Sequence, residues 1–248
     1  QTQQNDAFGQ DPFLVPIEDR ARLKTMFNKG FVEFSNKTLG RLSGSVSLFN
    51  YNYFFNSVLF TDEGVIQNKL QGEEIVVGGS YRNRIGPLYL EGSVDYTVVG
   101  ELTGNKFDAR ARYTLNEGNS LLGSVHVSSR MPDFNYLLYQ SDYRNFNWQN
   151  TDTFDNIRTK SIKFGFDSRS YGLLSAEYST LDNYTYFAST ATEEEIGLGQ
   201  ETAFVRPFQE SGTVNHLKVK YEKELKWRKW ALMNTVMYQE VTQDSQVL

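Results

Sequence analysis

The chain has 248 residues, a formal net charge of −5, no cysteine and only two histidines. These numbers exclude a disulfide scaffold, a thiol nucleophile and a zinc site of cysteines or clustered histidines, and we expect neither a metal nor a cofactor. The acidic balance argues against nucleic acid as a partner, and no stretch approaches the roughly 18 consecutive apolar residues of a membrane-spanning helix.

The composition combines a polar average with many aromatic rings. Mean hydropathy is −0.51 and hydrophobic residues make up 39% of the chain, yet it contains 18 Phe, 15 Tyr and 3 Trp. Disordered chains are poor in aromatic residues, so disorder is excluded. Two architectures remain: a soluble all-β domain with a thin core, and a barrel with an apolar exterior and a wet interior, which needs only half of each strand to be apolar.

From the N-terminus onward, the expected elements are strands. Residues 1–20 are predicted to be an extended segment, and a weakly defined strand lies near Phe31 to Phe34. From residue 42 on, apolar residues occupy every second position in nine stretches: 42–48, 75–82, 88–98, 106–115, 121–128, 161–167, 174–179, 216–222 and 230–241. Because successive strand side chains point to opposite faces, the pattern predicts roughly ten strands, each with one apolar and one polar face, and no helix.

The connections between these strands alternate in length. Short turns are predicted at 83–87, 116–120, 169–172 and 226–229, and long connections at 56–71, 131–158 and 189–211. The connection 100–105 is a modest exception, because it is short at a position where a long connection is expected. Since it stands at that position, the order of short and long positions along the chain is unchanged. Outer-membrane barrels have short periplasmic turns and long external loops. The alternation therefore favours a transmembrane, antiparallel up-and-down β-barrel over a soluble β-sandwich, and we assign residues 21–248 to it.

Charged residues gather on the polar face of two adjacent predicted strands. If the apolar face contacts lipid, these side chains line a water-filled path and tune which solutes pass. The predicted pore-lining residues are Glu91, Asp95, Lys106, Asp108, Arg110 and Arg112. The alternative is that they pair across strands and fill a closed interior. His126 lies beside Ser124 and Ser128, but the sequence offers no third group for catalysis, so no enzyme is expected.

The segment 131–150 contains too many aromatic rings for a freely moving loop. Its rings are Phe134, Tyr136, Tyr139, Tyr143, Phe146 and Trp148. Such a segment should fold onto another surface. Three roles stay open: an inward constriction, a cap over the mouth, or a docking surface for a partner.

The same segment carries a family resemblance. The run Met131 to Asn150, MPDFNYLLYQSDYRNFNWQN, resembles the putative-porin family of Bacteroidota outer membranes, and the stretches 173–187 and 238–244 are similar too. The likeness covers roughly residues 42–248 and implies an outer-membrane β-barrel with no catalytic residues. Family members are longer, and the chain stops at Leu248 without a closing aromatic residue. We therefore expect part of a larger barrel, with further strands absent from this sequence.

Together, the pattern and the resemblance predict a porin of the bacterial outer membrane. It would contact outer-membrane lipid and let small hydrophilic solutes diffuse passively. The alternative is a barrel subunit that acts as a scaffold or docking partner in an outer-membrane assembly, with a protein partner or a homo-oligomer and no transport of its own. A soluble secreted β domain is the third possibility.

Overall fold

The structure is a computed structural model that describes residues 19–56, 58–61, 64–141, 146–190 and 205–242. Most of them belong to one antiparallel ten-stranded sheet. In sheet order its strands are β1 (Arg22–Asn36), β2 (Gly40–Phe54), β5 (Lys69–Ile85), β6 (Leu88–Val99), β7 (Asn105–Asn116), β8 (Asn119–Arg130), β11 (Ile157–Ser168), β12 (Gly172–Asp182), β15 (Val214–Trp227) and β16 (Trp230–Thr242). The order follows the chain, which confirms the predicted all-β, up-and-down architecture.

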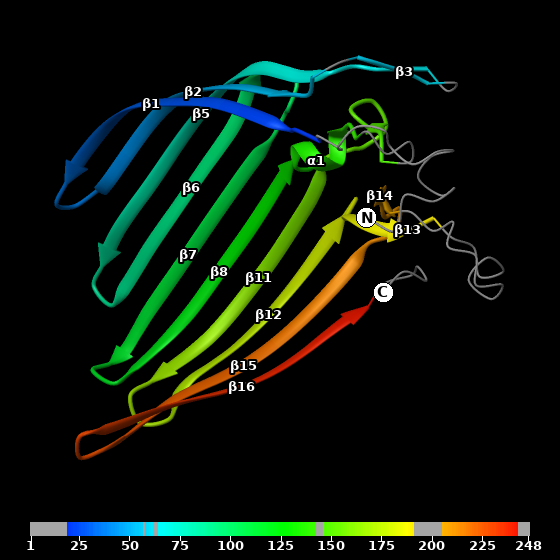
Figure 1. Cartoon of the computed structure of the whole chain (residues 1–248). Helices are drawn as coiled ribbons and strands as arrows, with labels where there is room; N and C mark the ends of the chain where they lie inside the picture. Colours follow the sequence, from blue (N-terminus) through cyan, green and yellow to red (C-terminus); the bar gives the residue numbers. More distant parts are fainter. Residues whose placement is uncertain (1–18, 57, 62–63, 142–145, 191–204, 243–248) are drawn as a thin grey trace, which may run out of the picture.

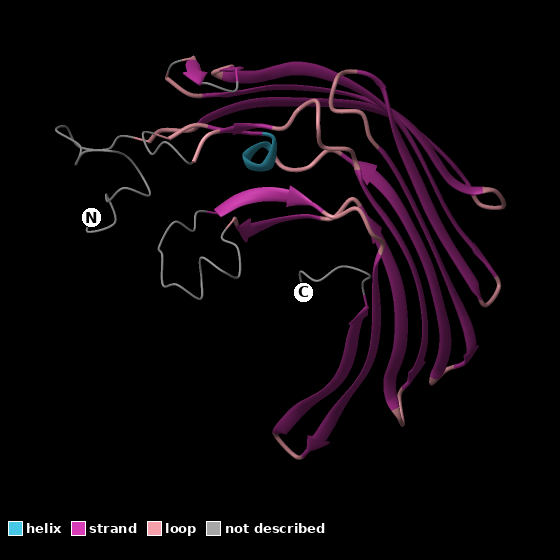
Figure 2. Cartoon of the chain, turned by 90° about the vertical axis from the view of Figure 1, so that its right-hand side faces the viewer, coloured by secondary structure: helices cyan, strands magenta, loops and turns pink. Residues whose placement is uncertain are grey.

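The sheet forms a curved wall with two free edges. Figures 1 and 2 show the strands side by side along an arc, with β1 at one edge and β16 at the other. The curvature is that of a barrel wall, but β1 and β16 do not pair among the described residues. The predicted extended segment 1–20 falls outside the described part of the chain except for its last two residues.

Strand β1 is much longer than the sequence predicted. Only Phe31 to Phe34 had been expected, whereas fifteen residues of β1 pair with β2. Its apolar residues do not keep to alternate positions: Phe27 and Phe31 lie on one face, Val32 and Phe34 on the other. The period of two is therefore obscured in β1, and pairing with β2 defines the strand instead.

Short turns join the strands at one end of the wall, and the connections at the other end are long except for residues 100–104 between β6 and β7 (Figure 1). The β5–β6 turn uses Gly86 at φ +58°, a left-handed conformation that glycine adopts without steric cost. In the β7–β8 turn, the Asn116 side chain accepts a 3.0 Å hydrogen bond from the Gly118 amide. These are the turn chemistries that the sequence indicated.

The two faces of the wall differ in exposure. Apolar side chains on one face are open to the surroundings, with Val94 49% exposed, Phe164 62% and Leu174 51%. On the opposite face, small polar side chains such as Ser175 and Ser179 are buried. Because folded soluble proteins rarely leave such a continuous apolar surface uncovered, the open face is suited to lipid.

The buried core lies between the sheet and a long connection. The connection between β8 and β11 contains α1 (Phe134–Leu137), β9 (Leu138–Tyr139) and β10 (Trp148–Gln149). Its residues Leu137 and Leu138 pack with Tyr51, Tyr53, Phe55 and Leu70. Figure 2 shows α1 on the concave side of the wall. The prediction of no helix was wrong here, because a single helical turn is too short to leave a periodic pattern.

Two further hairpins stand at the long-connection end. They are formed by β3 (Leu59–Thr61) with β4 (Gly64–Ile66), and by β13 (Thr185–Ser189) with β14 (Val205–Gln209). Among the described residues no helix is long and apolar enough to cross a membrane.

Candidate functional site

The concave face of the wall carries the charged residues. On β2, Tyr51 and Tyr53 contact α1, which lies on the concave side, and Ser43 alternates with them on the same strand face. From Ser43, cross-strand pairing leads over β5 and β6 to Asp108 on β7. The structure therefore brings all six predicted pore-lining residues to the concave face: Glu91, Asp95, Lys106, Asp108, Arg110 and Arg112. That they line a pore stays a prediction.

Register extends this charged surface well beyond β6 and β7. One row of directly paired positions runs across eight strands through Arg41, Arg82, Glu91, Arg110, Ser124, Lys163, Glu177 and Lys218. Within it, Arg82 and Glu91 form an ion pair at 2.7 Å, and Lys163 approaches Glu177 at 4.0 Å. Of this row, only Glu91 and Arg110 are among the residues predicted from the sequence to line a pore. The other members occupy polar positions of predicted strands, but only the register shows that they are neighbours.

A polar network surrounds His126. Its Nδ1 lies 2.8 Å from an Asp108 carboxylate oxygen and its Nε2 lies 3.0 Å from the Ser128 hydroxyl. Asp108 also pairs with Lys106 at 2.9 Å. The structure thus supplies the third group that the sequence did not reveal. However, β8 is paired on both sides, with β7 and β11, so its backbone N–H groups are engaged in the sheet and not free to stabilise an oxyanion.

The aromatic segment folds against the concave face. Phe134 packs on Tyr51 and Tyr53, with ring centroids 5.3 and 5.5 Å apart. Tyr139 stacks on Trp148 at 5.0 Å. Phe146 belongs to the described residues and Tyr143 lies outside them. This placement is inward, at the end of the wall that carries the long connections.

The segment also contacts the β13–β14 hairpin. Tyr136 stacks on Phe187 at 4.6 Å, and the Trp148 ring lies 6.0 Å from the same phenylalanine. Burial raises the pKa of the Tyr136 phenol. The pKa of Tyr139 is also raised, mainly by burial and further by the nearby Asp19 carboxylate. Both phenols are therefore protonated at neutral pH and suited to a packed position.

Two hollows lie side by side on the concave face. The first, of about 360 Å³, is lined by Arg41, Arg82, Lys106 and Arg110 together with Glu33, Glu91 and Asp108. We call it the balanced hollow, because Arg41 pairs with Glu33 at 3.4 Å, Arg82 with Glu91 and Lys106 with Asp108.

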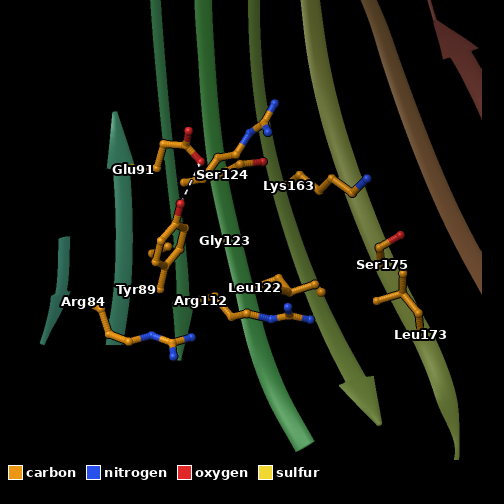
Figure 3. A pocket seen from close by; sticks show the side chains of 13 residues that line it. Arg84, Tyr89, Glu91, Arg112, Leu122, Gly123, Ser124, Lys163, Leu173 and Ser175 are labelled. Atoms are coloured by element: carbon orange, nitrogen blue, oxygen red, sulfur yellow. Dashed lines mark hydrogen bonds between the residues drawn. The ribbon is translucent and has the colours of Figure 1, made fainter. Parts of the chain in front are cut away.

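The second hollow, of about 530 Å³, is drawn in Figure 3. It is nearer the short turns, because Arg84 and Leu173 stand next to the strand ends Ile85 and Gly172. We call it the cationic hollow, because Arg84, Arg110, Arg112 and Lys163 line it with a single carboxylate, Glu91. Its floor includes Leu122, Ser124, Gly165 and Leu173. Tyr89 stands beside the floor, and its hydroxyl donates to Glu91 at 3.4 Å.

Comparison with known protein families identifies the family to which this chain belongs. The sequence profile of a family described as "Putative porin" matches residues 1–248. The chain belongs to the putative porin family. No curated protein matches it in a sequence search. Membership of the putative porin family indicates, in general terms, an outer-membrane, porin-like protein.

Proposed function

We propose that this putative porin lets small hydrophilic solutes diffuse passively across an outer membrane along its concave face. The supporting observation is the sidedness of the wall: exposed apolar side chains such as Val94 and Phe164 on one face, and charged rows on the other. In a bilayer the apolar face meets acyl chains, and water fills the space before the charged face.

The proposal includes a closed barrel. Strands β1 and β16 each have one edge without a partner in the described sheet, and unpaired backbone groups are not tolerated in hydrocarbon. In the membrane both edges would therefore be paired. The aromatic segment, packed against the concave face beside β2, would narrow the path at the end that carries the long connections.

Single-channel conductance in planar bilayers tests the function. The full-length protein should give stepwise currents in potassium chloride, and vesicles containing it should swell in an uncharged sugar. A correctly inserted protein that gives neither current nor swelling would show that the interior is sealed and would overturn the proposal.

The scaffold alternative makes a different prediction about the aromatic segment. A docking surface needs accessible rings, whereas Leu137 and Leu138 are buried and Phe134 packs on Tyr51 and Tyr53. This packing favours the inward role of the segment. Co-purification of a stoichiometric partner that crosslinks to residues 134–148 would favour the scaffold instead.

A further inference from the structure

We propose that the cationic hollow binds a small organic anion with an apolar body, such as an aliphatic or aromatic carboxylate. The site rests on the proposed function, since a solute reaches it through the water-filled path. It deepens that function by naming the class of solute that the wall retains.

Charge is the first reason. In the long cross-strand row, Arg110, Ser124 and Lys163 are consecutive, with no carboxylate between the two cations. Adjacent strands are about 4.8 Å apart, so the backbones of Arg110 and Lys163 are separated by roughly 10 Å. Both long side chains can reach an anion held between them, above the Ser124 hydroxyl.

The nearby carboxylates are already engaged. Glu91 pairs with Arg82 at 2.7 Å, and Asp167 pairs with Arg112 at 2.6 Å. Glu177, the next residue of the row, forms a longer ion pair with Lys163 at 4.0 Å. Among the described residues, the side chains of Arg84 and Arg110 have no ion pair within 4 Å and no hydrogen bond. The hollow therefore keeps an excess of positive charge that a bound anion would neutralise.

Shape is the second reason. Gly165 leaves room on the floor, and a Cβ added there would meet the Leu122 side chain at 3.4 Å. Leu122 and Leu173 offer an apolar surface among the cations that line the hollow, and Figure 3 shows Leu122 beside Arg112. At about 530 Å³, the hollow is within the range of roughly 300–1,000 Å³ typical of small-ligand sites.

These two features together select the ligand. Guanidinium groups bind carboxylates through paired, charge-assisted hydrogen bonds. The leucines and the Tyr89 ring would cover an apolar body, which inorganic phosphate lacks. The balanced hollow next to it has the same kinds of side chain but no comparable excess charge, so it serves as an internal control.

Calorimetric titration of the full-length protein in detergent tests the site. The probe is benzoate, with benzyl alcohol as the uncharged analogue and inorganic phosphate as the anion without an apolar body. Benzoate should bind most tightly. Equal binding of phosphate would show a general anion surface, and equal binding of benzyl alcohol a merely apolar one; either result would overturn the proposal.

Two variants test the positive charge and the shape of the cationic hollow separately. Arg110→Gln with Lys163→Gln should weaken benzoate binding about tenfold or more, as expected for the loss of charged hydrogen bonds. Gly165→Leu keeps every charge but fills the hollow, and should also weaken binding. The matched control, Arg41→Gln with Lys106→Gln, removes two cations from the balanced hollow and should leave benzoate binding unchanged.

Sugar-driven vesicle swelling separates this site from the porin function. The site would be overturned if the control variant weakened benzoate binding as much as the test variants do. It would also be overturned if neither test variant affected benzoate binding. Both conclusions hold even if sugar still permeates. Absence of sugar flux with intact, variant-sensitive benzoate binding would overturn passive diffusion and keep the site. Each variant should retain the β-sheet circular dichroism spectrum of the parent protein.

Discussion

The balanced and cationic hollows lie on one wall and share Glu91 and Arg110, yet they differ in charge. In the balanced hollow, Arg41, Arg82 and Lys106 each have a carboxylate within 3.4 Å. In the cationic hollow, Arg84 and Arg110 have no such partner among the described residues, and the floor includes the apolar side chains of Leu122 and Leu173. The difference shows that strand alternation sets which face is polar, whereas cross-strand register sets which charges remain uncompensated.

The largest expected effect concerns the aromatic segment, which packs on the concave face at the end of the wall that carries the long connections. Leu137 has 0% exposure, and its truncation to alanine should cost about 2–5 kcal/mol through lost burial and a residual cavity. In Leu137→Ala the segment should detach, so single-channel conductance should increase and proteases should cleave the segment. Leu174→Ala, on the open apolar face, should change neither property. Unchanged conductance and protease resistance in Leu137→Ala would contradict the inward packing.

The second prediction tests the sidedness on which both hollows depend. Val94→Arg places a charge on the face assigned to lipid and should destabilise the folded protein by about 2–4 kcal/mol. Ser93→Arg, on the adjacent residue, places the same charge on the concave face opposite Asp108 and should have little effect. Urea titration of the protein folded into lipid vesicles measures both. Equal destabilisation by the two variants would show that the faces are assigned wrongly.

The third prediction compares the electrical effects of the hollows. Arg110→Glu with Lys163→Glu should shift permeation from anions toward cations, because charged walls tune the ions that pass. The expected change in permeability ratio is below about tenfold, or about 1.4 kcal/mol. The control is the pair swap Glu33→Arg with Arg41→Glu, which keeps the net charge of the balanced hollow. Reversal potentials in a salt gradient give the ratio, and an equal shift in the control would remove the distinction between the hollows.

The smallest effect is expected from pH, at the tyrosines of the aromatic segment. Burial raises the pKa of Tyr139 above the ordinary tyrosine value of about 10. A raised folded pKa means that the packing contributes fully below the ordinary value and is lost as pH rises through the folded pKa. The absorbance of tyrosinate should show more than one late-ionising phenol, since the pKa of Tyr136 is raised too, and Tyr139→Phe should remove one of them. A late part of the curve unchanged by this substitution would contradict the buried position.

Part of the candidate site was accessible from the sequence. Glu91, Asp95, Lys106, Asp108, Arg110 and Arg112 were predicted to share a polar face, and the structure places them on one face. Lys163 and Glu177 were missed as neighbours, although both occupy polar positions of predicted strands. Asp108 was not recognised as a partner of His126, because eighteen residues separate them in the chain.

The amino-acid sequence by itself determined the all-β class, the roughly ten strands of the main sheet, the two faces of the wall and the alternation of short and long connections. These properties follow from local rules, since side chains alternate along any strand and turns need particular residues. Only the tertiary structure decided the register, the extent of β1, the short helix α1 and the inward fold of residues 131–141. A shift of the strand register by two residues would keep the same side chains on each face. The alternation in the sequence therefore does not determine which cations lie next to a carboxylate, and only the observed strand pairing does.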